Sequence, residues 1–309
     1  MKNILILFIL LLNSLLTFGG NLYIKTFGNQ ENPAILFLHG GPGYNCANFE
    51  ITTAQALANQ GYFVIVYDRR GEGRSTDEKA KYTFQETFDD MNSIYESYKL
   101  PKATLIGHSF GGIVGSLFAE KYPEKTSALV LVGAPISLQE TFRTIIKTCK
   151  QIYQTKNDSV NFSYIELLEK MDTTTLEYST YSFAHAMQNN FYRPKQPTDE
   201  AKTIYELFKT DSTLKKYASK MTYQGPQGFW MNEKYTTLDL MGTIKTLLAK
   251  KVKVFGLYGK DDGLYSNDQV IKLQSIIGIS NLRYLDRCSH SVFADQQTLF
   301  INSLKDWIR

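Results

Sequence analysis

Short, unbroken apolar runs that alternate with longer amphipathic stretches constrain the fold of this chain more than any other feature. Strands are predicted at 34–38, 62–67, 103–106, 128–132, 252–258 and 282–285, and the first, second and fourth of them are mostly unbroken apolar runs. Strands that are apolar on both sides lie in sheets covered on both faces. Helical spacing between the runs, as in 84–98 and 113–122, predicts crossover connections and a mainly parallel α/β sheet with helices on both faces.

The alternation of strands and helices breaks after Pro135 and returns near residue 248. The stretch 136–247 has helical character and is rich in Tyr, Phe, Thr and Lys. We interpret it as a helical cap inserted into one α/β domain, whose two parts are 20–135 and 248–309. Two tandem domains are the alternative, but the second would then lack a complete sheet.

The N-terminal residues resemble a targeting segment rather than part of the fold. Lys2 precedes apolar runs at 4–12 and 15–18, and the small residues Gly19 and Gly20 follow. This layout predicts a secretory signal peptide over 1–19 and a secreted or periplasmic protein. An uncleaved membrane anchor is the alternative, although the run is short for a span, which needs about 20 apolar residues. No stable membrane span is expected after cleavage.

Composition narrows the functional classes. The net charge of +4 comes from 34 basic and 30 acidic residues, which gives no case for a nucleic-acid partner. The three cysteines, Cys46, Cys149 and Cys288, lack metal-ligand spacing, and at least one of them is unpaired within the chain. The sequence does not decide whether Cys46 and Cys288 form a disulfide. It does not decide the oligomeric state either. No metal or organic cofactor is expected.

The segment Gly107-His108-Ser109-Phe110-Gly111 matches the pattern G-x-S-x-G between an apolar strand and a helix. In this nucleophile elbow the serine sits on a sharp turn whose crowding only glycine neighbours tolerate. The following helix N-terminus favours the negative charge that develops during acyl transfer. Ser109 is therefore the predicted nucleophile; a glycine-rich turn without catalysis is the alternative.

Two further motifs supply partners for such a serine. His39-Gly40-Gly41-Pro42-Gly43 follows an earlier strand and forces a tight backbone path, so the N–H groups of Gly41 and Phe110 are candidate oxyanion donors. Asp261 and Asp262 follow the strand at 252–258, and His290 follows the last strand. The order Ser109, acid, His290 is typical of α/β hydrolases.

These motifs together resemble the α/β-hydrolase superfamily, and more closely its proline iminopeptidase-like branch. The resemblance is carried by the HGGPG loop at 39–43, the elbow, His290 and two stretches: 68–75, which resembles D-x-R-G-x-G-x-S, and 259–262, which resembles G-x-x-D. It extends from about Tyr23 to the C-terminus and is weak through the cap. It implies the α/β-hydrolase fold, a Ser109–Asp262–His290 triad, and Asp262 rather than Asp261 as the acid.

The resemblance implies a serine hydrolase that cleaves an amide or ester bond of a small molecule or short peptide. An aminopeptidase of the proline iminopeptidase type is the first expectation, and a carboxylesterase or lipase-like enzyme is the alternative. A non-catalytic binding protein on the same fold is the third. The elbow, Gly-His-Ser-Phe-Gly, departs from the Gly-Gly-Ser-Trp-Gly common in iminopeptidases. Candidate partners for a substrate amine are Asp199, Glu200 and Glu233, and candidate pocket aromatics are Phe191, Tyr192, Phe229 and Trp230.

Overall fold

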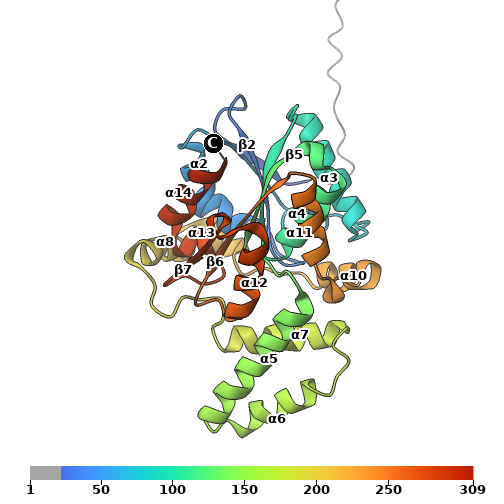
Figure 1. Cartoon of the computed structure of the whole chain (residues 1–309), viewed down its shortest axis with the longest axis vertical. Helices are drawn as coiled ribbons and strands as arrows, with labels where there is room; N and C mark the ends of the chain where they lie inside the picture. The colour runs from blue at the N-terminus through green and yellow to red at the C-terminus, as the bar shows by residue number, and fades with distance from the viewer. Residues whose placement is uncertain (1–21, 309) are drawn as a thin grey trace, which may run out of the picture.

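The computed structural model describes residues 22–308, so the predicted signal peptide at 1–19 lies outside the described residues. The described chain forms one seven-stranded sheet in the order β1-β3-β2-β4-β5-β6-β7 (Figure 1). Only β1 is antiparallel to its neighbour, and all other pairs are parallel. The strands are β1 (Ile24–Phe27), β2 (Ala34–Leu38), β3 (Phe63–Tyr67), β4 (Ala103–His108), β5 (Thr126–Val132), β6 (Lys253–Gly259) and β7 (Leu282–Leu285).

Each central strand contributes side chains to two separate cores, because successive residues of a strand point to opposite faces. In β3, Phe63, Ile65 and Tyr67 belong to one core, while Val64 and Val66 belong to the other. All five residues are buried. The unbroken apolar runs of the sequence thus reflect a sheet covered on both faces, which confirms the predicted fold class.

Helices cover the two faces in two groups. One face carries α3 (Phe84–Ser97), α4 (Phe110–Lys121), α11 (Met241–Ala249) and α12 (Asn267–Ile277). The other face carries a short helical segment, α1 (Ala47–Phe49), η1 (Glu50–Ala54) and α2 (Gln55–Ala58), together with α13 (Val292–Asp295) and α14 (Gln297–Ile308). Short 3₁₀ turns η2 (Pro123–Lys125), η3 (Tyr235–Thr237) and η4 (Ile279–Asn281) complete the connections.

The helices inserted between β5 and β6 fall into two groups. One group packs on itself, and the helices of the other contact their neighbours separately. Helices α5 (Leu138–Thr155), α6 (Ser159–Leu168) and α7 (Leu176–Gln188) pack on one another and extend away from the sheet (Figure 1). In contrast, α8 (Asp199–Thr210) packs against α13, α9 (Ser212–Tyr217) packs against α1, and α10 (Gln224–Glu233) contacts α7. We call α5, α6 and α7 the cap.

The chain returns to the core earlier than the boundary at 248 that the sequence suggested. Helix α11 begins at Met241 and packs against α4 and β6 of the core. Its apolar residues Ile244 and Leu247 are fully buried there. Within residues 22–308, no helix is long and apolar enough to cross a membrane.

Candidate active site

Ser109 lies at the turn between β4 and α4 in a backbone conformation that L-residues rarely adopt. Its φ and ψ are 52° and −123°, and its N–H donates to the carbonyl of Val132 at 3.0 Å. The flanking residues must be glycines because a side chain would not fit there. A Cβ on Gly111, for example, would lie 2.0 Å from the carbonyl oxygen of Leu38. A strained serine held between crowded glycines at the head of a helix is the geometry of a nucleophile elbow.

His290 and Asp262 are brought together from loops that are 28 residues apart in the sequence. Asp262 follows β6 and His290 follows β7, and Nδ1 of the imidazole lies 2.8 Å from Oδ2 of the carboxylate. Both side chains are buried, with exposures of 6% and 1%. A carboxylate on Nδ1 fixes the tautomer and leaves Nε2 free to exchange a proton.

Asp261, the other acid that the sequence offered, has its carboxylate bound elsewhere. Its Oδ2 accepts a hydrogen bond from the backbone N–H of Lys195 at 3.0 Å, near the protein surface. The structure therefore pairs the histidine with Asp262 and leaves Asp261 as a surface contact.

The hydroxyl of Ser109 makes no hydrogen bond to His290 among the described residues. The elbow and the histidine loop are nonetheless neighbours, since the rings of His108 and His290 are 4.8 Å apart and Nε2 of His108 lies 3.2 Å from the carbonyl oxygen of His290. Burial and the neighbouring His290 lower the pKa of His108 well below its usual value, so it is neutral. Catalytic hydrogen bonds are often open in ligand-free sites and shorten when substrate binds.

The two candidate oxyanion donors lie beside the serine. Gly41 and Phe110 line the same small pocket as Ser109. Gly41 has a φ of 111°, where a side chain is disfavoured, so the glycine lets the loop backbone turn at this point. The sequence-predicted groups Ser109, Gly41 and Phe110 are thus together at one pocket, and Asp262 and His290 form their own pair.

Arg69, which the sequence analysis did not single out, forms hydrogen bonds to the loop at 39–43. Its Nη1 donates to the carbonyl of His39 at 2.5 Å and its Nη2 to the carbonyl of Gly40 at 2.6 Å. Nη2 also pairs with Oε2 of Glu72 at 2.8 Å. The Gly40 carbonyl belongs to the same peptide group as the Gly41 N–H. A cation on that carbonyl polarises the peptide and strengthens the N–H as a donor.

His39 adds a second hydrogen bond to the same carbonyl. Its Nε2 accepts from the backbone N–H of Arg69 at 3.0 Å, so the ring proton is on Nδ1, which lies 2.8 Å from the Gly40 oxygen. Burial, and then the charge of Arg69, lower the pKa of His39 well below its usual value, so the ring is neutral. Burial raises the pKa of Glu72, although Arg69 opposes that shift. The available sequence signal was the density of charge in the turn at 68–75, which contains three arginines, Asp68 and Glu72.

A second buried carboxylate, Asp295, supports the histidine loop. Its Oδ2 accepts the N–H of Ser289 at 2.7 Å, and its Oδ1 accepts the hydroxyl of Tyr205 at 2.5 Å. Burial raises the pKa of Asp295 to about 6, with a smaller contribution from Asp262. The residue fixes the backbone directly before His290.

The pocket at Ser109 is lined by uncharged side chains. Its floor comes from the core and its roof from α5, α7 and neighbouring segments. The lining residues are Gly41, Ser109, Phe110, Ile113, Pro135, Leu138, Thr141, Phe183, Tyr235, Leu264 and Tyr265. The hydroxyl of Tyr265 donates to the carbonyl of Gly133 at 2.8 Å. The site therefore offers an apolar surface with few free polar groups, which suits a small uncharged group.

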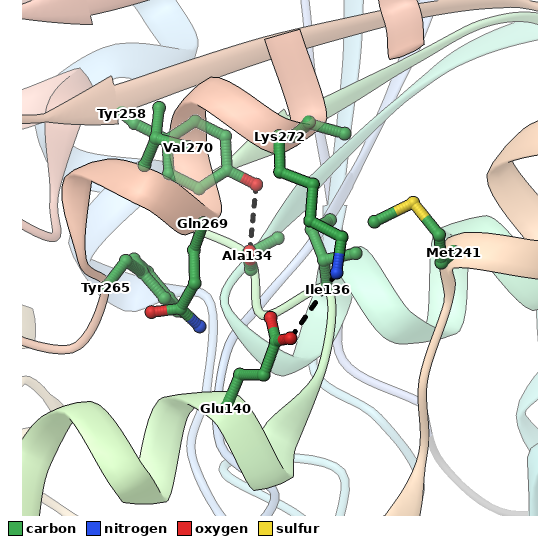
Figure 2. Close-up of a pocket in the computed structure, with 10 residues that line it drawn as sticks. Ala134, Ile136, Glu140, Met241, Tyr258, Tyr265, Gln269, Val270 and Lys272 are labelled. Atoms are coloured by element: carbon green, nitrogen blue, oxygen red, sulfur yellow. Dashed lines mark hydrogen bonds and ion pairs between the residues drawn. The ribbon is translucent and has the colours of Figure 1, made fainter. Parts of the chain in front are cut away.

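A neighbouring pocket, which also includes Tyr265 in its wall, shows how α5 is attached to the core (Figure 2). Glu140 on α5 and Lys272 on α12 form an ion pair with a separation of 3.4 Å. The hydroxyl of Tyr258 donates to the carbonyl of Ala134 at 2.8 Å, just before the cap begins. These links fix the first turn of α5 relative to β6 and α12.

None of the four cap-region aromatics proposed from sequence belongs to the wall of the Ser109 pocket. Phe229 packs behind Phe110 with ring centroids 5.1 Å apart, and Nε1 of Trp230 donates to the carbonyl of Thr174. Phe191 packs against Gly263, and the ring of Tyr192 lies 5.0 Å from that of His290. Sequence pattern could not separate wall residues from core residues, because both are apolar and aromatic.

The three candidate amine partners are also engaged away from this pocket. Asp199 pairs with Lys202 at 2.8 Å on the surface, and Glu200 accepts the hydroxyl of Thr298. Glu233 accepts the backbone N–H of Phe84 at 2.7 Å. Each carboxylate thus has a local structural partner.

Neither a disulfide nor a metal-binding cluster is present within residues 22–308. Cys46, Cys149 and Cys288 are free and buried, so the open question of a Cys46–Cys288 disulfide is answered in the negative for this structure. No group of three or more His, Cys, Asp or Glu side chains in this part of the chain is arranged to hold a metal ion.

Comparison with known proteins places the chain in a family. Residues 33–297 match the model of the alpha/beta hydrolase fold family. A proline iminopeptidase from Saccharolobus solfataricus is 31% identical over 50% of this chain and 56% of its own length. A proline iminopeptidase from Chitinophaga pinensis is 22% identical over 94% of each chain.

The solved structure of a proline iminopeptidase-related protein from Thermus thermophilus superposes with a TM-score of 0.65 at 19% identity, covering 94% of this chain and 95% of the other. At that identity the likeness shows the fold alone. Together with the family match and the relatives in sequence, it makes this chain a member of the α/β-hydrolase family that is similar to proline iminopeptidases.

Proposed function

We propose that the protein is a serine hydrolase that cleaves a carboxylic ester or amide through an acyl-enzyme on Ser109. The single observation that carries this proposal is the strained serine at the head of α4, in a pocket with Gly41 and Phe110. The His290–Asp262 pair on the adjoining loops supports it. These are the groups that acyl transfer requires.

The mechanism follows from the positions of these groups. Nε2 of His290 takes the proton as Oγ of Ser109 attacks the substrate carbonyl, and Asp262 stabilises the imidazolium. The N–H groups of Gly41 and Phe110 bind the oxyanion, whose charge Arg69 favours through the Gly40 peptide. His290 then protonates the leaving group, and a water molecule activated by the same imidazole hydrolyses the acyl-enzyme to the acid and free Ser109.

The uncharged pocket wall favours an uncharged acyl group, and hence a carboxylesterase. A substrate with a free α-amine needs a carboxylate at the site, because burying an unpaired ammonium is costly. The wall contributes no carboxylate, and Asp199, Glu200 and Glu233 are held elsewhere. The preference that sequence resemblance gave to an aminopeptidase is therefore reversed in our proposal.

Aminopeptidase activity stays as the second candidate, since relatives in sequence bear the name proline iminopeptidase. The two candidates differ in their need for a free amine. We would assay residues 20–309 with 4-nitrophenyl acetate and butyrate beside prolyl- and alanyl-naphthylamide. Ester turnover without amide turnover is expected. Faster amide release that is lost on N-acetylation of the substrate would establish the aminopeptidase instead.

Labelling by a fluorophosphonate tests the nucleophile itself. The wild-type chain is expected to gain one covalent adduct on Ser109, and Ser109→Ala none, with an unchanged circular dichroism spectrum. Modification of the Ala variant at the same rate would refute Ser109 as the nucleophile, and loss of activity without loss of fold supports it.

We also propose export of the protein, on the basis of the charged, apolar and small-residue layout of 1–20. Expression of the full chain in a bacterial host, followed by fractionation and N-terminal sequencing, tests this. A chain that begins near Gly20 in the periplasm or medium supports cleavage. An intact chain in the membrane fraction supports the anchor, and an intact chain in the cytosol contradicts both.

A further inference from the structure

Thr141 lies in the wall of the Ser109 pocket and carries a buried hydroxyl. The residue lies in the first turns of α5, is 1% exposed and lines the pocket together with Leu138 and Phe183. Within residues 22–308 its Oγ1 has no hydrogen-bond partner. A buried hydroxyl without a partner costs about 1–3 kcal/mol, so native proteins rarely keep one without a use for it.

The helix itself offers this hydroxyl a partner that it does not use. A threonine in a helix commonly donates to the carbonyl four residues earlier. Four threonines of the insertion do so: Thr155, Thr180, Thr203 and Thr210. For Thr141 that carbonyl belongs to Ser137, which accepts only the backbone N–H of Thr141 at 3.0 Å.

The other hydroxyls of the pocket wall have assigned roles. That of Tyr265 donates to Gly133, and that of Tyr235 is hydrogen-bonded by the side chain of Ser179. Ser109 is the proposed nucleophile. Thr141 is thus the wall residue whose hydroxyl is left to bind something that enters the pocket.

The surroundings select the kind of atom that Thr141 would bind. The first turn of α5 carries the partial positive charge of an 18-residue helix, which favours an electronegative atom. The wall contains no charged side chain that could neutralise a carboxylate, so a neutral oxygen fits better than an anion. The ion pair between Glu140 and Lys272 and the hydrogen bond from Thr144 to Gln269 hold α5 in position.

We infer that Thr141 forms a specificity subsite for a neutral oxygen atom in an otherwise apolar substrate acyl chain. The hydroxyl donates a hydrogen bond to that ether or carbonyl oxygen, while Ser109 attacks the ester carbonyl. The inference rests on the proposed serine hydrolase function and adds the substrate class: uncharged acyl esters that carry one further oxygen.

Matched esters test this inference. In 4-nitrophenyl pentanoate, ethoxyacetate and 3-methoxypropanoate the acyl chains have equal length, and an oxygen replaces one carbon at two different positions. The ratio of kcat/KM for each ether ester to that for pentanoate is measured for wild type, Thr141→Val, Thr141→Ser and Ser182→Ala. Comparing ratios between enzymes cancels the intrinsic reactivity of each ester.

Thr141→Val is expected to lower the ratio by about tenfold for at least one ether ester, since one lost hydrogen bond has that effect. Thr141→Ser keeps the hydroxyl and should keep the wild-type ratio. Ser182 on α7 is the control, because its buried hydroxyl also lacks a partner within residues 22–308 but does not line the pocket. Its variant should leave both ratios unchanged.

Thermal unfolding gives a readout that does not depend on activity. Removal of a hydroxyl with no partner in the free protein should leave the Tm of Thr141→Val equal to or above that of wild type. A clear fall in Tm would mean that the hydroxyl has a structural partner, and would overturn the inference.

Equal ratios in wild type and Thr141→Val for both ether esters would also overturn it. Failure of the proposed function has a separate signature. In that case the wild-type protein neither turns over pentanoate nor reacts with fluorophosphonate, and the Thr141 subsite falls with it.

Discussion

The floor and the roof of the Ser109 pocket are built in different ways. We use floor for the core loops at and behind the pocket, which carry Gly41, Ser109 and His290. Buried, charged and closely paired groups hold these loops, such as Asp262 on His290 and Arg69 on the loop at 39–43. The roof, formed by α5, α7 and Tyr235, presents uncharged side chains and one hydroxyl without a partner among the described residues. Under the proposed function, the floor would carry out acyl transfer, and the roof would select the shape and polarity of the acyl group.

This comparison predicts that changes in the floor reduce kcat, while changes in the roof alter the choice of substrate. The largest effect is expected for Asp262→Asn, which keeps the shape of the side chain but favours the wrong imidazole tautomer. We expect kcat to fall by about 10³–10⁴-fold with little change in KM. Steady-state kinetics on 4-nitrophenyl butyrate measure it, with Asp261→Asn as the matched control. Equal losses in the two variants would contradict the pairing of His290 with Asp262.

Asp295 tests whether the floor is stabilised by a protonated carboxyl. Its folded pKa of about 6 lies above the usual value of 3.8, so the folded state binds the proton more tightly. That stability is fully present below pH 4 and is lost as pH rises to about 6. A shift of two units corresponds to about 3 kcal/mol.

Urea denaturation of wild type and Asp295→Asn at several pH values measures this effect. Because the amide cannot ionise, the variant should gain stability relative to wild type as pH rises from 4 to 6, and the gap should stay constant above that. Burial and Asp262 raise the pKa of Asp295, whereas the hydrogen bonds from Tyr205 and from the Ser289 N–H, and then His290, favour the ionised form. A gap that does not vary with pH would show that folding does not raise the pKa of Asp295.

Variants of Arg69 and Glu72 distinguish an effect on kcat from an effect on the stability of the floor. Arg69→Met removes the cation that is paired with the buried carboxylate of Glu72, which should cost about 3–5 kcal/mol of stability. The double variant Arg69→Met, Glu72→Gln removes both charges and should recover much of that loss. Both variants lack the cation on the Gly40 carbonyl, so kcat should fall by about 10- to 100-fold with KM nearly unchanged.

Denaturation and kinetics on the single and double variants check this prediction. Affinity for a boronic acid, which forms a tetrahedral adduct, should fall in parallel with kcat, since both depend on the oxyanion donors. Recovery of kcat together with stability in the double variant would mean that Arg69 acts only through the fold.

The smallest effect is expected in the roof. Phe183→Ala removes an apolar wall residue on α7 and should lower kcat/KM by a few-fold for longer acyl chains, and less for acetate. A series of 4-nitrophenyl esters from acetate to octanoate measures the chain-length profile. The matched control is Tyr181→Ala, a residue on α7 that is 53% exposed. A uniform fall in kcat across the series would place Phe183 with the floor rather than the roof.

The floor could be predicted closely from the sequence, because its parts are local. The elbow is one strand, one turn and one helix, and the glycines at 107 and 111 are required by contacts within a few ångströms. The order of Ser109, the acid and His290 followed from the succession of strands, since loops at the same edge of a parallel sheet meet in space. The choice between Asp261 and Asp262 needed the resemblance to a family, and in the structure only Asp262 contacts the imidazole.

The sequence by itself therefore determined the sheet, the fold family and which residues meet in the floor, because strand burial and turn geometry depend on short stretches of chain. Only the tertiary structure decided the roof. Leu138, Thr141, Phe183 and Tyr235 come from separate segments of a helical insertion whose apolar residues serve both its own core and the pocket. No local pattern distinguishes the two uses, since burial against another helix and burial against a substrate select the same side chains.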